Sequence, residues 1–167
     1  GHEFSINAGA IALMNSRMSG SEIALAELAC ERVHGRKHCR MLIGGYGMGF
    51  TLRAALSGLH ADAEIVVAEL VPEVIKWARG PMADLTAGGL DDTRVRIREG
   101  DVGEVIASAR GRFDAILLDV DNGPDGLSRN ANNKLYTSHG LKTARAALRP
   151  GGLLAIWSAA PDADDWG

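Results

Sequence analysis

The sequence predicts an α/β domain with a Rossmann-like, mostly parallel sheet of strand order 3-2-1-4-5 and helices on both faces. Short apolar runs alternate with helical patterns from residue 41 to residue 158, which is typical of such a sheet. The runs at 115–118 and 153–156 are continuously apolar, as expected for strands buried on both sides. A glycine-rich turn follows the first run and a carboxylate ends the second, which indicates a nucleotide-binding unit.

Length and composition suit one domain with its own core. The chain has 167 residues, 46% of them hydrophobic and 23% charged, and its 21 glycines allow many tight turns. Its formal net charge is −3 and no basic face is evident, so nucleic-acid binding is not indicated. The apolar runs are too short to span a membrane, and no signal peptide opens the chain. We therefore expect a cytoplasmic protein without membrane association.

The first residues predict a small hairpin and one helix. Residues 3–6 and 11–15 flank a short Asn-Ala-Gly-Ala stretch, which is typical of a β-hairpin. Ser19 and Glu22 have the spacing of a capping box, so a helix is expected from there through Val33. Its apolar side would consist of Ile23, Ala24, Leu28 and Ala29.

Strands and helices then alternate strictly. We expect strands at 41–45, 64–69, 94–98, 113–120 and 153–158. We expect helices at 51–59, 72–79, 102–109 and 135–148. On these elements, Trp77 is expected to pack against the sheet and Trp157 to lie in the core.

Two cysteines and two histidines near the end of the first helix invite a metal-site interpretation. They are Cys30, His34, His38 and Cys39, and three of them follow one another at four-residue steps. The helix should end near Gly35, however, which would break their shared face. Buried cysteines and surface histidines are therefore expected, with neither a disulfide framework nor a metal site.

The first strand-to-helix turn carries the main functional signal. Its glycines are Gly44, Gly45, Gly47 and Gly49, and the last three have G-x-G-x-G spacing. Glycines let the backbone approach a ligand closely, and the following helix directs N–H groups toward it. Glu69 ends the next strand, where its carboxylate can accept hydrogen bonds from ribose hydroxyls. A dinucleotide-type motif would need glycine at Phe50, so the turn looks like an adenosylmethionine-binding one.

Taken together, these residues resemble the spermidine synthase (aminopropyltransferase) family, within the class I adenosylmethionine-dependent methyltransferase superfamily. The glycine turn, Glu69 and the Arg-Pro-Gly-Gly turn are shared across the superfamily, whereas Asp119 followed by Leu-Tyr-Thr points to the aminopropyltransferase branch. The matching segments are 44–53, 67–74, 99–102, 113–119, 135–137 and 147–152.

The resemblance implies a sulfonium substrate, S-adenosylmethionine or its decarboxylated form, and a small-molecule amine as acceptor, with no metal. By the resemblance, Glu69 would hold the ribose and Asp101 the adenine amino group. Asp119 would accept a proton from the attacking amine or orient it, and Asp121 and Tyr136 would complete the catalytic set. The implied nucleoside-binding residues are Gly44, Gly45, Gly47, Gly49, Glu69, Leu70, Asp101, Val102 and Asp119.

The chain departs from the family pattern at three places. Met48 stands where the family turn has Asp, and Asn122 stands where the family has its second carboxylate, with Asp121 displaced by one. Of the family's Tyr-His-Glu segment, only Glu22 is kept. These changes affect the amine side of the site more than the nucleoside side.

Each implied site residue also has a purely structural interpretation. Asp101 can cap a helix, and Asp119 and Asp121 can serve only their turn. Glu69 can be an unoccupied charge at a strand end. The loop 122–134 is either a lid over the site or a solvent loop, and its length and position favour a lid.

Three functions therefore stay open: aminopropyl transfer as the first choice, methyl transfer to an unknown acceptor, and nucleoside binding without turnover. We expect a hairpin at 1–18 and a Rossmann-like domain at 19–167. The antiparallel hairpin that ordinarily follows the fifth strand of this fold is expected to be missing. A truncated chain would explain its absence, and a partner covering the bare edge, as in a homodimer, is the alternative.

Overall fold

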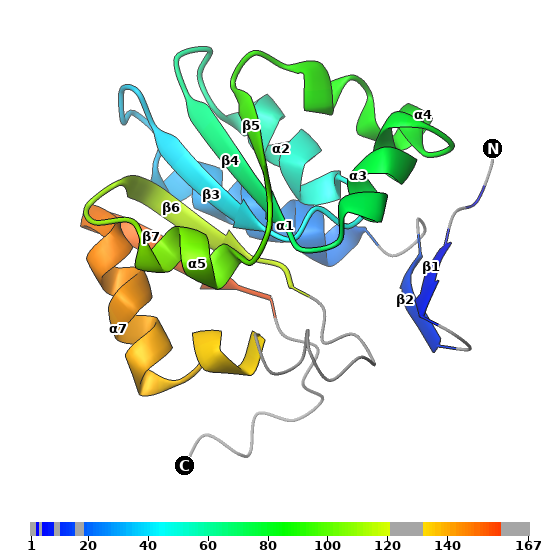
Figure 1. Ribbon diagram of the computed structural model, residues 1–167. Helices are drawn as coiled ribbons and strands as arrows, with labels where there is room; N and C mark the ends of the chain where they lie inside the picture. The colour runs from blue at the N-terminus through cyan, green and yellow to red at the C-terminus, as the bar shows by residue number, and fades with distance from the viewer. Residues whose placement is uncertain (1–2, 4, 9–10, 16–18, 121–131, 158–167) are drawn as a thin grey trace.

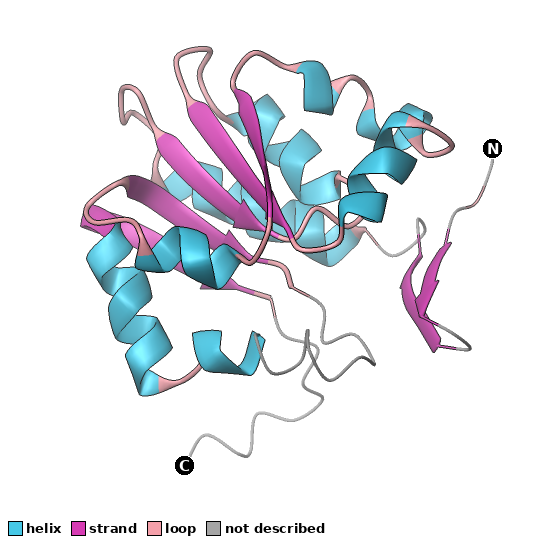
Figure 2. Cartoon of the chain, viewed as in Figure 1, coloured by secondary structure: helices cyan, strands magenta, loops and turns pink. Residues whose placement is uncertain are grey.

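The computed structural model describes residues 3, 5–8, 11–15, 19–120 and 132–157, which contain a five-stranded parallel sheet (Figures 1 and 2). Its strands are β3 (Arg40–Gly44), β4 (Glu64–Glu69), β5 (Val95–Glu99), β6 (Phe113–Leu118) and β7 (Leu148–Ile156). They lie in the order β5-β4-β3-β6-β7, and all four pairings are parallel. This confirms the predicted fold and its strand order 3-2-1-4-5.

Helices cover both faces of the sheet, as predicted (Figure 1). On one face lie α1 (Gly20–Arg32), α2 (Phe50–Gly58), α3 (Pro72–Arg79), the short α4 (Ala83–Thr86) and the 3-10 turn η1 (Gly89–Asp91). On the other face lie α5 (Val102–Ala107) and α7 (Ser138–Ala147). Among the described residues, no helix combines the length and the apolar character needed to cross a membrane.

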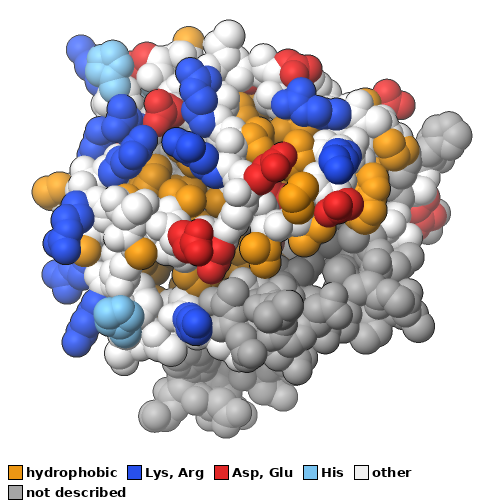
Figure 3. Space-filling view, in the orientation of Figure 1, with side chains coloured by type: hydrophobic (Ala, Val, Ile, Leu, Met, Phe, Trp, Pro, Cys, Tyr) orange, Lys and Arg blue, Asp and Glu red, His pale blue; other side chains and the backbone are white. Residues whose placement is uncertain are grey.

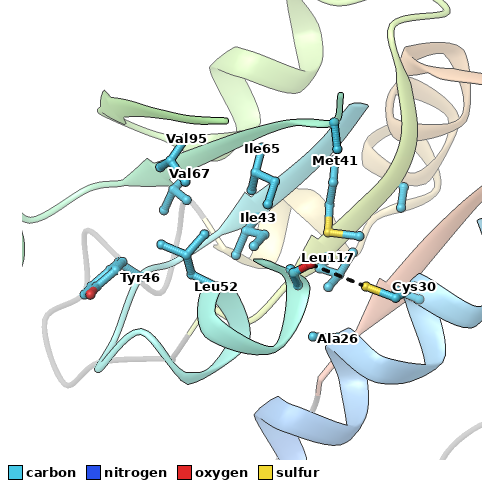
Figure 4. Packing of buried hydrophobic residues seen from close by; sticks show 14 of the residues in the cluster. Ala26, Cys30, Met41, Ile43, Tyr46, Leu52, Ile65, Val67, Val95 and Leu117 are labelled. Atoms are coloured by element: carbon cyan, nitrogen blue, oxygen red, sulfur yellow. Dashed lines mark hydrogen bonds between the residues drawn. The ribbon is translucent and has the colours of Figure 1, made fainter. Parts of the chain in front are cut away.

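Alternating side chains of the strands feed two separate cores. On β3, Met41 and Ile43 belong to the core under α1 and α2, whereas Leu42 belongs to the core under α5 and α7. Figure 4 shows the first core, in which side chains of the sheet meet Ala26 and Cys30 from α1 and Leu52 from α2. Burial of each large aliphatic side chain contributes about 1.5–3 kcal/mol, so these two clusters hold the layers together.

The N-terminal residues form the predicted hairpin. Strands β1 (Ser5–Ala8) and β2 (Ile11–Asn15) pair antiparallel in a two-stranded sheet of their own. β1 begins two residues later than expected, because Ser5 is the residue that pairs with Asn15.

A buried carboxylate ties β7 to the rest of the sheet. Asp114 on β6 has a side chain that is only 3% exposed, and Arg36 Nη1 and Arg149 Nη1 approach its two oxygens at 2.8 and 2.9 Å. The backbone N–H of Arg40 donates to the same carboxylate at 2.8 Å. Burial opposes ionisation, but the Arg40 amide and the two guanidinium groups outweigh it, so the pKa of Asp114 is lowered. The contacts of Asp114 thus hold β6, β7 and the start of β3 together at one point.

The predicted C-terminal helix and strand have different boundaries. Residues 132–135 form a separate helical turn, and α7 begins only after Thr137, whose Oγ1 accepts the N–H of Gly140 at 3.1 Å. This cap divides the helix that we expected over 135–148. β7 begins at Leu148 instead of residue 153, because Leu148 already pairs with Phe113; the register then shifts over the Arg-Pro-Gly-Gly turn before Leu153 pairs with Ala115.

Two expectations about α1 were wrong. Leu28 is 65% exposed, and of the predicted apolar side only Ala29 is buried; the other buried residues of α1 are Glu22, Ala26 and Cys30. Ser19 occupies the N-cap position but its side chain makes no capping hydrogen bond. The capping box is therefore absent although the helix begins where it predicted.

Both tryptophan predictions were also wrong. Trp77 is 41% exposed, because α3 buries Val74, Ile75 and Ala78 on its other side. Trp157 is only half-buried and follows β7, an edge strand whose residues 153–155 are half-exposed as well. The two cysteines are buried as expected, and burial raises the pKa of each thiol to about 11.

Candidate functional site

The ends of four strands meet at one edge of the sheet. Gly44 pairs in register with Ala68 of β4 and with Leu118 of β6, so the residues that follow these strands are neighbours. The backbone N–H of Asp119 donates to the carbonyl of Gly44 at 2.9 Å, and that of Gly100 donates to the carbonyl of Glu69 at 2.8 Å. Open parallel sheets bind ligands at this edge, so it is the candidate site.

The glycine turn lies directly against the end of β6. Gly45, Gly47 and Gly49 all have positive φ, at 89°, 56° and 83°, a region that glycine adopts at little cost. A Cβ on Gly45 would collide with the backbone oxygen of Asp119. Any side chain there would therefore push the turn and Asp119 apart.

Glu69 holds the glycine turn by its carboxylate. It is only 8% exposed, its Oε2 accepts the backbone N–H of Tyr46 at 2.8 Å, and its Oε1 accepts that of Val71 at 2.9 Å. Each carboxylate oxygen can accept a second hydrogen bond. Glu69 is thus a structural clamp of the turn, and its predicted bonds to ribose hydroxyls would use the remaining acceptor positions.

Asp101 is the N-cap of α5, because its Oδ1 accepts the N–H of Gly103 at 2.8 Å. This confirms the structural interpretation, and its contact with adenine stays a prediction. Val102 is 4% exposed and lies behind Gly44, where a Cβ would come within 2.9 Å of the Val102 side chain. Only the backbone of Val102 is therefore placed to meet a ligand. Leu70, in contrast, is 46% exposed beside Glu69.

Asp119 is held by a residue that the sequence analysis did not single out. Thr51, at the first turn of α2, is 2% exposed and its Oγ1 donates to Asp119 Oδ2 at 3.0 Å. The sequence signal that could have identified Thr51 is its hydroxyl, two residues after Gly49, the last glycine of the turn. Tyr136 is half-buried, and this burial, followed by the negative charge of Asp119, raises its pKa. Asp121 lies outside the described residues, as does most of the predicted lid over 122–134, whose last residues, 132–134, belong to the helical turn at 132–135.

Tyr46, in the middle of the glycine turn, is a second residue that the sequence analysis passed over. It is 4% exposed, and its hydroxyl is a buried polar atom without a hydrogen-bond partner in the described part of the chain. Burial, only partly offset by Arg79 and Arg53, raises its pKa to about 12. Figure 4 shows its ring at the margin of the first core. The adjoining Gly49 is required there, because a Cβ would meet this hydroxyl at 2.5 Å.

Comparison with known proteins decides the family. The model of the spermine/spermidine synthase domain matches residues 24–162. The chain belongs to this family. It is 28% identical over 121 residues to a polyamine aminopropyltransferase of Sulfolobus acidocaldarius, covering 72% of this chain and 39% of the relative. This member of the spermine/spermidine synthase family thus spans about two-fifths of that relative's length.

Solved structures agree on the fold. The spermidine synthase of Thermotoga maritima superposes with a TM-score of 0.66 at 23% identity, covering 83% of this chain and 44% of that one. The human methyltransferase-like protein 13 superposes with a TM-score of 0.56 at 19% identity, covering 80% and 60%. This chain therefore has the fold that spermidine synthase shares with methyltransferases, as its resemblance to the spermidine synthase family implied.

Proposed function

We propose that this chain is the nucleoside-binding part of an aminopropyltransferase that uses decarboxylated S-adenosylmethionine and a small amine. The observation that carries the proposal is the position of Asp119. Its backbone touches the glycine turn, and Thr51 holds its carboxylate at the strand edge where ligands of this fold bind. Membership of the spermine/spermidine synthase family supports the same reaction.

The arrangement of the nucleoside side fits an adenosyl group. The glycine turn leaves room for close backbone approach, and the buried Glu69 has free acceptor positions for two ribose hydroxyls. The exposed side chain of Leu70 would pack against the adenine ring. Asp101 would accept a hydrogen bond from the adenine amino group with the oxygen that does not cap α5.

The reaction needs alignment more than acid catalysis. The lone pair of the amine nitrogen attacks the carbon next to the sulfonium, and the carbon–sulfur bond breaks with its electrons going to sulfur. A neutral thioether, methylthioadenosine, leaves, so no proton has to be given to the leaving group. The attacking amine must be neutral and must lose one proton overall, which Asp119 would accept directly or through a water.

The charge at this edge favours the decarboxylated substrate. Asp119 would lie near the aminopropyl end, and its negative charge adds to burial in raising the pKa of Tyr136. A substrate carboxylate placed there would be repelled, whereas an ammonium group or a cationic amine would be attracted. The site is therefore better suited to a polyamine-type acceptor than to an acidic one.

Calorimetric titration with decarboxylated S-adenosylmethionine, S-adenosylmethionine and methylthioadenosine tests this proposal. We expect the decarboxylated form to bind at least tenfold tighter than its carboxylated counterpart. Tighter binding of S-adenosylmethionine would favour methyl transfer, which the loss of the family's second carboxylate at Asn122 makes the second candidate. Binding of none of the three would contradict the nucleoside site itself.

The role of Asp119 has its own test. Asp119→Asn should abolish aminopropyl transfer to diamines while the affinity for methylthioadenosine changes by less than about threefold. The conservative change keeps a hydrogen-bond acceptor for Thr51, so the local structure is retained. A collapse of methylthioadenosine affinity would instead make Asp119 a ligand of the nucleoside.

A further inference from the structure

A hollow bordered by arginines lies on the α5 face of the sheet, and on β4 and β6 it lies toward the strand ends opposite to the candidate site. Its volume is about 690 Å³, and it extends from β5 to the amino ends of β4 and β6. Glu64 and Phe113, which line it, are the first residues of their strands. Glu69 and Asp119, in contrast, lie at the carboxyl ends of the same two strands. The hollow is therefore a separate feature of the molecule.

The position of β5 explains why arginines line this hollow. β5 is an edge strand, and its Arg96 and Arg98 pair in register with Val66 and Ala68, which lie in the core under α5. α5 has only six residues and leaves this part of β5 uncovered, so both arginines are exposed. A third, Arg112, enters from the connection between α5 and β6.

The three guanidinium groups are not neutralised by the protein around them. In the described part of the chain Arg98 has no hydrogen bond or ion pair, and Arg96 donates only to the backbone carbonyls of Thr93 and Val95. Arg112 stacks over the ring of Phe113, 5.9 Å from its centroid.

One acidic residue, Glu64, is among the residues that line the hollow. It is already engaged, since its carboxylate lies 3.8 Å from Arg40 Nε. The hollow therefore carries a net positive charge. In Figure 3, Lys and Arg side chains gather around apolar ones on this side of the molecule.

The floor of the hollow is apolar. Val66, Val105, Ala109 and Phe113 contribute to it, and only Ser108 adds a neutral hydroxyl. A volume of about 690 Å³ is that of a site for a small organic molecule. Guanidinium groups bind phosphates and carboxylates by charge-assisted, often paired hydrogen bonds.

We propose that this hollow binds a small organic anion, with a phosphate or carboxylate at the arginines and an apolar ring on the floor. The site differs from the nucleoside site in place and in charge, so it stands whether or not the chain transfers aminopropyl groups. Its ligand is recognised by Arg96, Arg98 and Arg112.

Titration of the whole chain with 1-naphthyl phosphate tests the proposal, because this probe joins a dianion to an apolar ring and contains no adenosine. It should bind at least tenfold tighter than 1-naphthol and than inorganic phosphate. A comparison with 1-naphthoate distinguishes the two anions: preference for either supports the site and names its chemistry. Saturating methylthioadenosine should leave the affinity unchanged.

Variants locate the binding. Arg98→Gln should lower the affinity for 1-naphthyl phosphate about tenfold, as expected for the loss of one charge-assisted hydrogen bond. Arg112→Gln repeats the test from a different element, should the first variant unfold. The matched control is Arg32→Gln, which removes the same charge from the exposed last turn of α1 on the other face of the sheet.

Four results would overturn the proposal. Equal binding of 1-naphthol would leave an apolar hollow without anion recognition. Displacement by methylthioadenosine would place the probe in the nucleoside site. Unchanged affinity in both arginine variants would place it elsewhere. Tighter binding and displacement by a short single-stranded DNA would make the surface one for nucleic acid.

Discussion

Replacing Gly45 with alanine would measure how strongly the glycine turn depends on its contact with Asp119. Gly45 has a φ of +89°, and a Cβ there would meet the Asp119 backbone oxygen well inside the 3.0 Å that real Cβ contacts keep. The left-handed conformation destabilises alanine by about 1–2 kcal/mol. Relief of the collision requires backbone movement and adds about 1–3 kcal/mol. The free energy of unfolding should therefore fall by about 3 kcal/mol.

Gly35→Ala is the matched control, because Gly35 has nearly the same φ, +85°, but nothing within 4 Å of the added Cβ. In Gly35→Ala the free energy of unfolding should fall only by the cost of the left-handed conformation, about 1–2 kcal/mol. Thermal unfolding should separate the variants, with a loss of roughly 10 °C for Gly45→Ala. Methylthioadenosine affinity should fall only in Gly45→Ala. Equal losses of stability in the two variants would refute the reasoning, because the collision would then contribute nothing.

Three further predictions concern single side chains. Asp114→Asn should lower the free energy of unfolding by about 3 kcal/mol near neutral pH, measured with urea. The pKa of Asp114 is lowered in the fold, so the contribution of its charge to stability is present above the ordinary pKa of about 3.9 and is lost in acid. The free energies of unfolding of the variant and the wild type should therefore converge at acid pH. A difference that stays constant down to acid pH would contradict this. Thr51→Val should lower turnover about tenfold with methylthioadenosine affinity unchanged, because only the orientation of Asp119 is lost; unchanged turnover would show that the hydroxyl is dispensable. Leu70→Ala should weaken methylthioadenosine binding about fivefold, whereas Leu28→Ala, on an exposed side of α1, should not; equal effects would remove Leu70 from the site.

Most of the sheet could be predicted because it depends on local patterns. On β3, the alternation of Met41, Leu42 and Ile43 between the two cores is a period-2 pattern that any parallel strand buried on both faces allows. The strict alternation of strands and helices then leaves few topologies, because parallel crossovers are right-handed. The order β5-β4-β3-β6-β7 is the one that was expected.

The buried side of α1 could not be predicted in the same way. Hydrophobicity favours Leu28, but the neighbouring helix approaches too closely for a large side chain. A Cβ at Gly58 of α2 would lie 2.8 Å from the Cys30 sulfur, and Ala26 and Ala29 are fully buried beside it. Small residues let the two helices pack, and their selection depends on a distance that no single helix encodes.

The burial of the C-terminal strand β7 could not be predicted for a different reason. The apolar run of residues 153–156 looks like a central strand, but β7 is the edge strand of the described sheet and its residues are half-exposed. Besides its pairing with β6, β7 is held by a polar contact, because its Arg149 and the distant Arg36 both lie against Asp114 of β6. A pattern of hydrophobicity contains no information about such a contact.

The candidate site contains residues that could be predicted from the sequence and residues that could not. Glu69 was predicted by position, and its two backbone hydrogen bonds show that the same carboxylate also builds the turn. Thr51 was missed because its partner, Asp119, is 68 residues away along the chain. The contact nevertheless has a consequence for function. Asp119 is joined to the glycine turn through its backbone, whose N–H donates to the carbonyl of Gly44, and to the helix that follows the turn through its side chain at Thr51. Movement of the turn on nucleoside binding would therefore shift the carboxylate that we propose to accept the proton of the amine, and the two substrates would then be coupled through these two contacts.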